Sequence, residues 1–231
     1  TYLIIKSKFM KKLFFLVGAF MLFGTIANAQ AVRDRNVIPL AVNLNQVLRM
    51  SITDGGNIEF TFNSIDDYRF GLSGDAGTSG SANPTSSDPM YVSNFIIASS
   101  TRWELSYGSE EATFIGTDNP ANTLELNNVG FSLVSNGIHV FGTEITSAPT
   151  VNGTEISALE PFPVILIVDN GDPLSSAGDI LDNDFTIIWR AGTAEVGLAP
   201  ATMNTVVLLE QSPSPTPDRY VTNVLFELAA L

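Results

Sequence analysis

Residues 102–107 read Arg-Trp-Glu-Leu-Ser-Tyr and place an apolar side chain at every second position. Successive side chains of a β-strand point to opposite faces, so Trp103, Leu105 and Tyr107 would share one face. The polar side chains between them would face the other way. This alternation predicts a half-buried β-strand with the ring of Trp103 in the core.

The same alternation recurs along most of the chain. It predicts further strands at residues 58–62, 95–97, 129–133, 185–189 and 220–228. A continuous apolar run, Val164–Val168, predicts a strand buried on both faces. Helical periodicity is weak and confined to Pro173–Leu181.

Turn residues separate these runs. Residues 54–57, Asp-Gly-Gly-Asn, and Asn136-Gly137 each predict a hairpin between two strands. Longer stretches at residues 71–89, 147–163 and 212–218 are predicted loops. Many short strands with such loops predict an all-β fold, an antiparallel β-sandwich of Greek-key or jelly-roll-like kind.

A targeting segment is predicted before this domain. Lys11 and Lys12 follow Met10, the apolar run Leu13–Phe23 comes next, and Ala27-Asn28-Ala29 offers small residues for signal peptidase. We therefore expect residues 1–29 to comprise upstream residues and a cleavable signal peptide. Residues 30–231 are expected to form a single elaborated β-sandwich domain without a membrane span. The predicted location is secreted, at the surface or outer envelope of a bacterium.

Composition excludes several classes of chemistry. The 231 residues contain 11 Lys and Arg against 24 Asp and Glu, with no Cys and one His. Removal of residues 1–29 takes away every lysine and leaves seven Arg against 24 acids, a formal charge of −17. Such acidity argues against nucleic-acid binding. The missing cysteines exclude disulfides, thiolate zinc sites, iron–sulfur clusters and a cysteine nucleophile, and one histidine excludes a His-rich metal centre.

Two motifs give a resemblance. Trp103-Glu104-Leu105 directly follows a predicted strand that ends in Ala98-Ser99-Ser100-Thr101. Near the C-terminus Tyr220 precedes Phe226-Glu227-Leu228. This layout resembles secreted bacterial surface β-sandwiches of the WxL-like and fimbrial-subunit-like kind, with Phe226 where the WxL family has a second Trp. The resemblance implies a non-catalytic β-sandwich of the cell surface.

Candidate catalytic and metal-binding residues lack a specific pattern. His139 is predicted to be a solvent-facing strand residue, because no nucleophile-elbow motif accompanies it. A hydrolase would need two placed carboxylates, and aromatic sugar platforms would have to come from Tyr68, Tyr91, Tyr107 or Trp189. The carboxylates available for such a role are Glu104, Glu110, Glu111, Glu155 and Glu160. No catalytic, cofactor-binding or metal-binding residue is predicted.

One acidic stretch is compatible with two interpretations, a calcium-binding loop and an ordinary turn. Residues 169–172, Asp-Asn-Gly-Asp, are followed by Asp179, Asp182, Asn183 and Asp184. Calcium favours such oxygen ligands on a flexible loop, but the same residues form ordinary turns.

Two functions remain in competition. The first is an exported, non-catalytic structural or adhesive protein, as in a filament or surface layer. Strand addition is one route to self-association, with residues 30–36 as the donor, unless these residues are disordered or fold back on their own domain. The alternative is a glycan- or peptidoglycan-binding module of the cell envelope. Exposure of Trp103 or Trp189 would favour the module, and burial of both would favour the structural role.

Overall fold

The computed structural model describes residues 38–74, 89–147, 156–171, 175–194 and 202–231. The chain divides into a first unit, Thr1–Leu44, and a compact unit, Asn45–Leu231. In the first unit, residues 38–44 contain neither helix nor strand. The predicted signal peptide and cleavage site lie outside the described residues.

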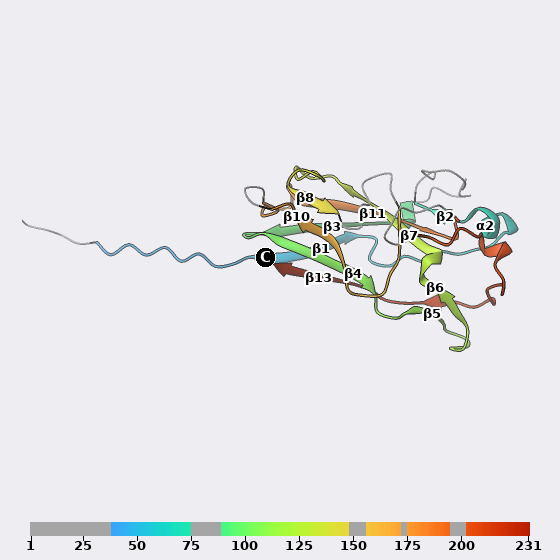
Figure 1. Ribbon diagram of the computed structural model, residues 1–231. Helices are drawn as coiled ribbons and strands as arrows, with labels where there is room; N and C mark the ends of the chain where they lie inside the picture. The colour runs from blue at the N-terminus through green and yellow to red at the C-terminus, as the bar shows by residue number, and fades with distance from the viewer. Residues whose placement is uncertain (1–37, 75–88, 148–155, 172–174, 195–201) are drawn as a thin grey trace, which may run out of the picture. The chain divides into compact units, whose positions relative to one another are not determined.

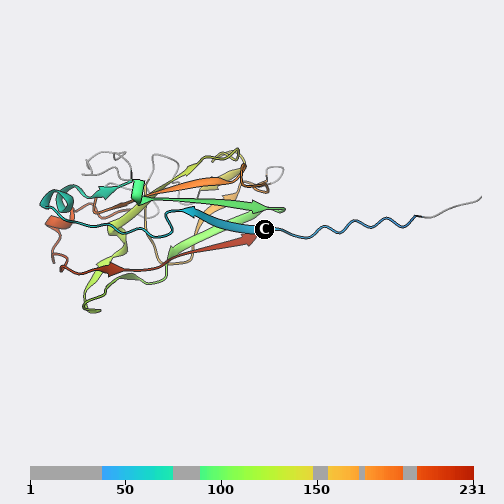
Figure 2. The same cartoon turned by 180° about the vertical axis from the view of Figure 1, so that it is seen from behind.

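The compact unit is built mainly from β-strands, as Figures 1 and 2 show from opposite sides. The strands are β1 (Leu48–Asp54), β2 (Leu72–Ser73), β3 (Val92–Ser99), β4 (Trp103–Ser109), β5 (Thr113–Gly116), β6 (Thr123–Glu125), β7 (Val129–Ser135), β8 (Ile145–Ser147), β9 (Ser157–Ala158), β10 (Val164–Asp169), β11 (Asp184–Ala191), β12 (Tyr220–Val221) and β13 (Val224–Ala230). The helices are α2 (Ile65–Phe70) and three single 3₁₀ turns at Pro89–Tyr91, Leu126–Asn128 and Leu208–Glu210.

These strands form three antiparallel sheets. The first has the order β1-β3-β11-β7-β9, with β2 also paired to β11. The second has the order β13-β4-β10-β8, and the third β12-β5-β6. Every pairing between these strands is antiparallel, so the all-β prediction is confirmed at this level.

Side chains of the two larger sheets share one apolar core. Phe95 of β3 lies 6.1 Å from Phe226 of β13 between ring centroids. Tyr107 of β4 meets Phe131 of β7 edge-on at 5.0 Å. Edge-on aromatic pairs are favourable beyond the apolar area that they bury, so these contacts help to hold the sheets together.

Trp103 is fully buried, as its place in the alternation predicts. Its indole meets the ring of Phe185 edge-on at 6.2 Å. The indole Nε1–H donates to the carbonyl oxygen of Ser176 at 2.6 Å, and the Trp103 backbone N–H donates to Ser176 Oγ at 2.9 Å. A buried indole needs such a partner, so Ser176 and Trp103 stabilise one another.

The strand predicted at residues 220–228 is divided in two. Residues Tyr220–Val221 pair with β5, whereas Val224–Ala230 pair with β4 in another sheet. Between them, Glu110 N–H donates to the carbonyl oxygen of Asn223 at 2.8 Å. The connection from β4 to β5 and that from β12 to β13 therefore change sheets at the same place.

Both predicted hairpins are wrong. After Gly55 the chain does not pair back on β1, which pairs with β3 instead. After β7 the backbone N–H of Asn136 donates to Asp184 O of β11 at 2.8 Å, and residues 138–141 form no strand. In both cases the strand pairs with a strand that is distant in sequence and not with the residues that follow the turn.

Smaller differences concern burial and local structure. Ile165 of β10 is 42% exposed, so this strand is not buried on both faces throughout. Residues 175–181 contain no helix, and Pro173 lies outside the described residues. The predicted loops at residues 71–89 and 147–163 contain the short strands β2 and β9.

Helix α2 was not predicted, although its start carries a capping box. Ser64 Oγ accepts from Asp67 N–H at 3.1 Å, and the Asp67 carboxylate accepts from Ser64 N–H at 2.8 Å. Within the described residues, no helix has the length and apolar character needed to cross a membrane.

Candidate functional site

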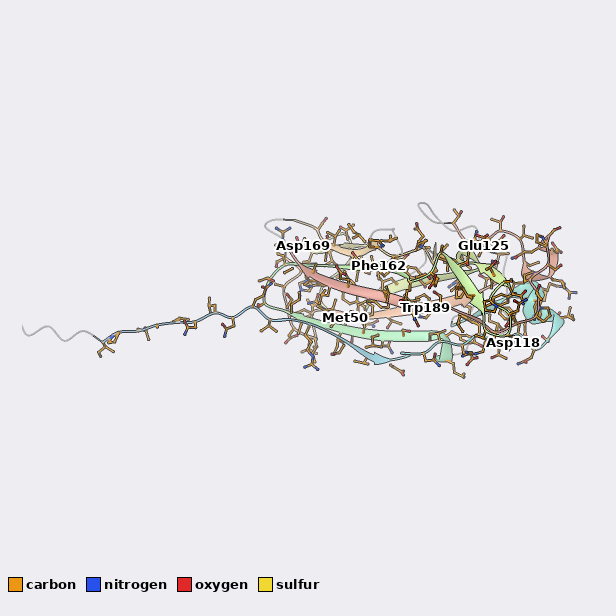
Figure 3. The ribbon with its side chains drawn as sticks, turned by 90° about the horizontal axis from the view of Figure 1, so that it is seen from below. Met50, Asp118, Glu125, Phe162, Asp169 and Trp189 are labelled. Carbon is orange, nitrogen blue, oxygen red and sulfur yellow. The ribbon has the colours of Figure 1, made fainter. Side chains whose placement is uncertain are left out.

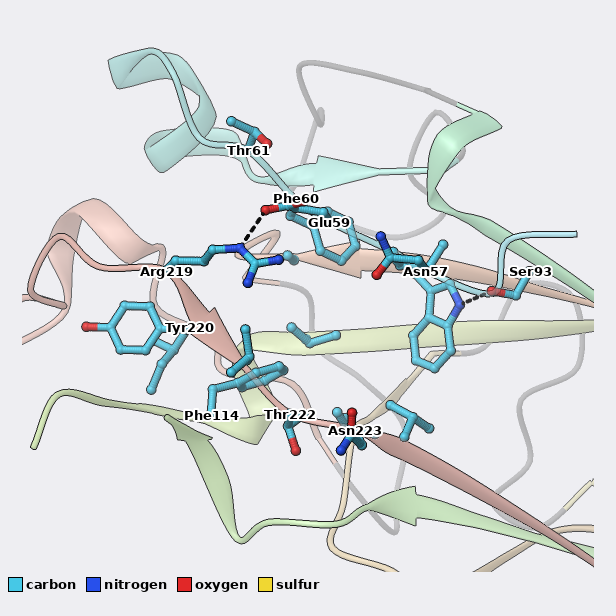
Figure 4. A pocket seen from close by; sticks show the side chains of 18 of the residues that line it. Asn57, Glu59, Phe60, Thr61, Ser93, Phe114, Arg219, Tyr220, Thr222 and Asn223 are labelled. Carbon is cyan, nitrogen blue, oxygen red and sulfur yellow. Dashed lines mark hydrogen bonds and ion pairs between the residues drawn. The ribbon is translucent and has the colours of Figure 1, made fainter. Parts of the chain in front are cut away.

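The compact unit contains a cavity of about 650 Å³ with a largely apolar lining. One wall is the extended segment Gly56–Phe62, and the other comes from residues 215–223, which include β12. The inner face of the first sheet supplies Phe95, Ile187 and Trp189 at the base. Figure 4 shows Phe60 and Phe114 on opposite sides of this space. The volume lies within the range of sites that hold a ligand or a peptide segment.

The first wall has the side-chain pattern of a strand without its hydrogen bonds. Ile58, Phe60 and Phe62 are half-buried against the core, whereas Glu59 and Thr61 are exposed. Among the described residues, no hydrogen bond joins the backbone of Gly56–Phe62 to any partner. The strand predicted at 58–62 is thus an extended segment whose backbone groups have no hydrogen-bond partner within the described ranges, and another strand can use such groups.

Gly55 fixes where this segment leaves β1. Its φ angle is +63°, in the left-handed region that glycine tolerates best. A Cβ atom at this position would lie 1.9 Å from the carbonyl oxygen of Val92. The Gly55 carbonyl also accepts from Ser93 Oγ at 2.6 Å. The chain therefore turns tightly against the start of β3 and continues along the cavity.

The second wall is held by the carboxylate of Asp218. This group accepts from the backbone N–H of Asp118 at 3.0 Å, from Asn119 N–H at 3.2 Å and from Asn122 Nδ2 at 2.8 Å. These hydrogen bonds, that from Asp118 first, hold the pKa of Asp218 below its ordinary value of 3.8. Asp218 thereby fixes the turn between β5 and β6 against the segment that leads into β12.

An ion pair joins the two walls. Arg219 Nε donates to Glu59 Oε1 at 2.9 Å, and both side chains are more than half exposed. Figure 4 shows this contact linking the two segments. The hydrogen bond from Arg219 and its positive charge lower the pKa of Glu59, and the same contact raises the pKa of Arg219. Screening by solvent makes such an exposed pair weak, so it positions the walls without locking them.

Aromatic side chains around the cavity contact one another. Phe60 stacks on Tyr91 with centroids 4.4 Å apart, and Phe62 meets Tyr68 at 5.3 Å. Trp189 is 6% exposed and its Nε1–H donates to Ser93 Oγ at 2.9 Å. Figure 3 marks Trp189 within the compact unit.

The aromatics considered as sugar platforms are mostly part of the core. Tyr91, Tyr107 and Trp189 are buried, and Tyr68 is half-buried beside the cavity. A sugar platform needs an open ring face, which three of these four residues lack.

The carboxylate of Asp169, in the possible calcium loop, already has protein partners. It accepts from Arg102 Nε at 2.8 Å, from Gly171 N–H at 2.7 Å and from Ser176 N–H at 2.6 Å. Burial opposes its ionisation, but the hydrogen bonds from Arg102, Gly171 and Ser176 outweigh this and lower the pKa of Asp169. Figure 3 places Asp169 and Asp118 at opposite ends of the compact unit.

Asp179 and Asp182 serve a turn. Asp182 Oδ2 accepts from Asp179 N–H at 2.9 Å, and Asp179 Oδ1 accepts from Leu181 N–H at 2.7 Å. Asp172 lies outside the described residues. Within the described part of the chain, no group of three His, Asp or Glu side chains is arranged to hold a metal ion.

The structure also describes His139 and four of the five glutamates considered for catalysis. His139 is half-buried outside any strand, with Nε2 3.2 Å from the carbonyl oxygen of Ala177, so the prediction of a solvent-facing strand histidine is wrong. Glu104 lies in β4, and Glu110 accepts from Asn223 Nδ2 at 2.7 Å. Glu111 is exposed, Glu160 is half-buried, and Glu155 lies outside the described residues.

A second feature is the segment Ile38–Leu44, which we call the arm. Its apolar side chains stand at alternate positions, and Ile38, Leu40, Val42 and Leu44 are 87, 89, 74 and 91% exposed. Sequence reasoning placed a possible donor strand at residues 30–36, which lie outside the described residues. The alternation of apolar side chains in the arm is the sequence signal that would have placed the donor strand at residues 38–44.

A comparison of the sequence with protein-family models and with curated proteins finds no significant match.

Proposed function

We propose that this protein is an exported, non-catalytic structural subunit of a bacterial cell exterior that associates with further copies of itself. Its compact unit would be a β-sandwich of Greek-key or jelly-roll-like kind. The shared core of the two larger sheets supports that arrangement.

The observation that carries the proposal is the arm. Ile38, Leu40, Val42 and Leu44 are all at least 74% exposed. Single exposed apolar side chains are ordinary, but a contiguous row of them marks an interaction site. A second protein surface that covers the row would remove this apolar area from water, so the arm favours association.

Burial of both tryptophans supports the same choice. Trp103 is fully buried and Trp189 is 6% exposed, so neither presents an open indole for stacking on a sugar. Glycan- or peptidoglycan-binding remains the second candidate, because the cavity combines aromatic side chains with Asn57, Arg219 and Asn223.

Light scattering on the mature chain, Gln30–Leu231, tests the proposal across a salt and calcium series. A formal charge of −17 opposes association in dilute buffer, and screening relieves it. We expect association that increases with salt. A protein that stays monomeric throughout while it retains envelope glycan in a pull-down would refute the structural role in favour of the binding module.

Export has its own test. Mass spectrometry of the envelope fraction should find an N-terminus at Gln30, and recovery of intact protein from Met10 in the cytoplasm would contradict an exterior location.

A further inference from the structure

We propose that the cavity of one copy receives the arm, Ile38–Leu44, of a second copy as an added β-strand. This inference rests on the proposed function, since it names the surfaces through which copies associate. It identifies the partner as the same chain and the acceptor as the space between Gly56–Phe62 and residues 215–223.

The arm has the composition of a strand that is buried on one face. Its apolar side chains lie at every second position, and the residues between them are Pro39, Ala41 and Asn43. It contains no charged residue, so entry into an apolar space leaves no ion without a partner. In an extended conformation its four large side chains would all point into the acceptor.

The cavity supplies what such a strand needs. Its lining includes the half-buried rings of Phe60, Phe114 and Phe226, which can cover apolar side chains. Its first wall offers seven residues, Gly56–Phe62, whose backbone groups have no hydrogen bond among the described residues. The arm also has seven residues, and each segment spans roughly 20 Å when extended. Added strands gain affinity from main-chain hydrogen bonds and specificity from alternate side chains.

The arm of the same chain cannot pair with Gly56–Phe62 along its whole length. β1 begins at Leu48 and runs for seven residues before Gly55, a distance of roughly 20 Å. Leu44 is four residues from Leu48 and reaches at most about 14 Å from it. Leu44 therefore cannot lie beside Gly56 even if the chain reverses at once, so only the Ile38 end of the chain's own arm would reach this wall. A second copy is the occupant that can pair with all seven residues of Gly56–Phe62.

Charge supports the pairing of the two regions. Residues 45–231 contain five Arg against 23 Asp and Glu, a formal charge of −18. Residues 30–44 contain Arg33, Arg35 and Asp34 and carry a formal charge of +1. Two compact units repel one another, but the segment that leads into the arm is attracted to an acidic neighbour.

The absence of cysteine from the chain makes a direct test simple. One protein carries Val42→Cys in the arm, and another carries Asn57→Cys at the cavity, where the native side chain is exposed. The two are mixed and treated with a short bis-maleimide, which tolerates small differences in register. We expect a cross-linked heterodimer from this mixture. Ile138→Cys, at an exposed position outside the cavity lining, is the matched control and should not cross-link to Val42→Cys.

A second pair of variants asks which face of the arm matters. Leu40→Ser with Leu44→Ser removes two inward side chains, whereas Ala41→Ser with Asn43→Ser introduces serine at the same number of positions on the opposite face. The first should lower the association constant more than about tenfold, and the second should leave it nearly unchanged.

The outcomes separate the two proposals. Association without a cross-link at residue 57 would overturn the cavity as acceptor while the structural role stands. A cross-link within one chain of the double variant, Val42→Cys with Asn57→Cys, would overturn the second copy as occupant. Parent protein that remains monomeric at every salt concentration would refute the proposed function itself.

Discussion

Replacement of Trp103 by alanine tests whether the two larger sheets depend on a common core. The side chain is fully buried, and a Trp buries roughly 150–250 Å² on folding. At about 25 cal/mol per Å² this corresponds to about 4–6 kcal/mol, an upper bound for the transfer from water. Measured truncations of buried Phe and Trp cost about 3–5 kcal/mol. We therefore expect Trp103→Ala to lower the free energy of unfolding by about 3–5 kcal/mol.

Urea unfolding followed by far-ultraviolet circular dichroism measures this change at low protein concentration, where association contributes least. With a slope of about 2 kcal/mol/M, the midpoint should fall by roughly 2 M. Trp103→Phe keeps a ring but loses the hydrogen bond to Ser176, and should fall between parent and alanine variant. Ile138→Ala, at a side chain that is 70% exposed, is the control and should change stability by less than about 0.5 kcal/mol. A Trp103→Ala protein within 1 kcal/mol of the parent would show that the core does not depend on this ring.

Two other side chains give predictions that depend on pH. The pKa of Asp169 is lowered, so its stabilising contribution is complete above the ordinary value of 3.8 and is lost as the pH falls through the lower folded value. Asp169→Asn should cost about 1–3 kcal/mol, because Arg102 is partly exposed and water can solvate its freed charge, and this loss should disappear in acid unfolding experiments. Burial, followed by the negative charge of Glu160, raises the pKa of Tyr107 well above its ordinary value of 10.0. Ultraviolet titration should therefore show at least one phenol that ionises only with alkaline unfolding. Tyr107→Phe should lower this signal by one phenol, and ordinary titration of every tyrosine near pH 10 would contradict the burial of Tyr107.

The sequence indicated which side chains of each strand point into the core, but it gave little information about which strands pair with one another. Alternation identified β3, β4, β7 and β11 and placed Trp103 in the core, because the burial of every second side chain leaves a local pattern. The partners of these strands are distant in sequence. β11, for example, lies between β3 and β7, and no local pattern encodes that order.

The wall of the cavity shows again that alternation does not indicate whether a segment has a strand partner. Ile58, Phe60 and Phe62 alternate as strand residues do, and the structure buries them in part. Alternation reports which side chains face an apolar surface, whether or not the backbone has a partner. That this segment has no backbone hydrogen bond to the rest of the described chain could therefore not be predicted. The arm shows the pattern without the surface that would cover it, and only the exposed fractions separate the two cases.

The position of β1 has a mechanical consequence. The arm leaves the compact unit at the Leu48 end of this strand, and the cavity wall begins after its Asp54 end. In a row of copies joined from arm to cavity, tension would pass along β1. Load that enters through the second wall, residues 215–223, would reach β1 from the rest of the unit. The hydrogen bonds between β1 and β3 lie across that direction, so the register from Leu48–Ser99 to Asp54–Asn94 would carry this load in shear. In shear, all hydrogen bonds between the two strands resist the force together. Peeling from one end would instead break them one after another. A chain of such subunits would withstand pulling far better than its weak surface ion pairs indicate.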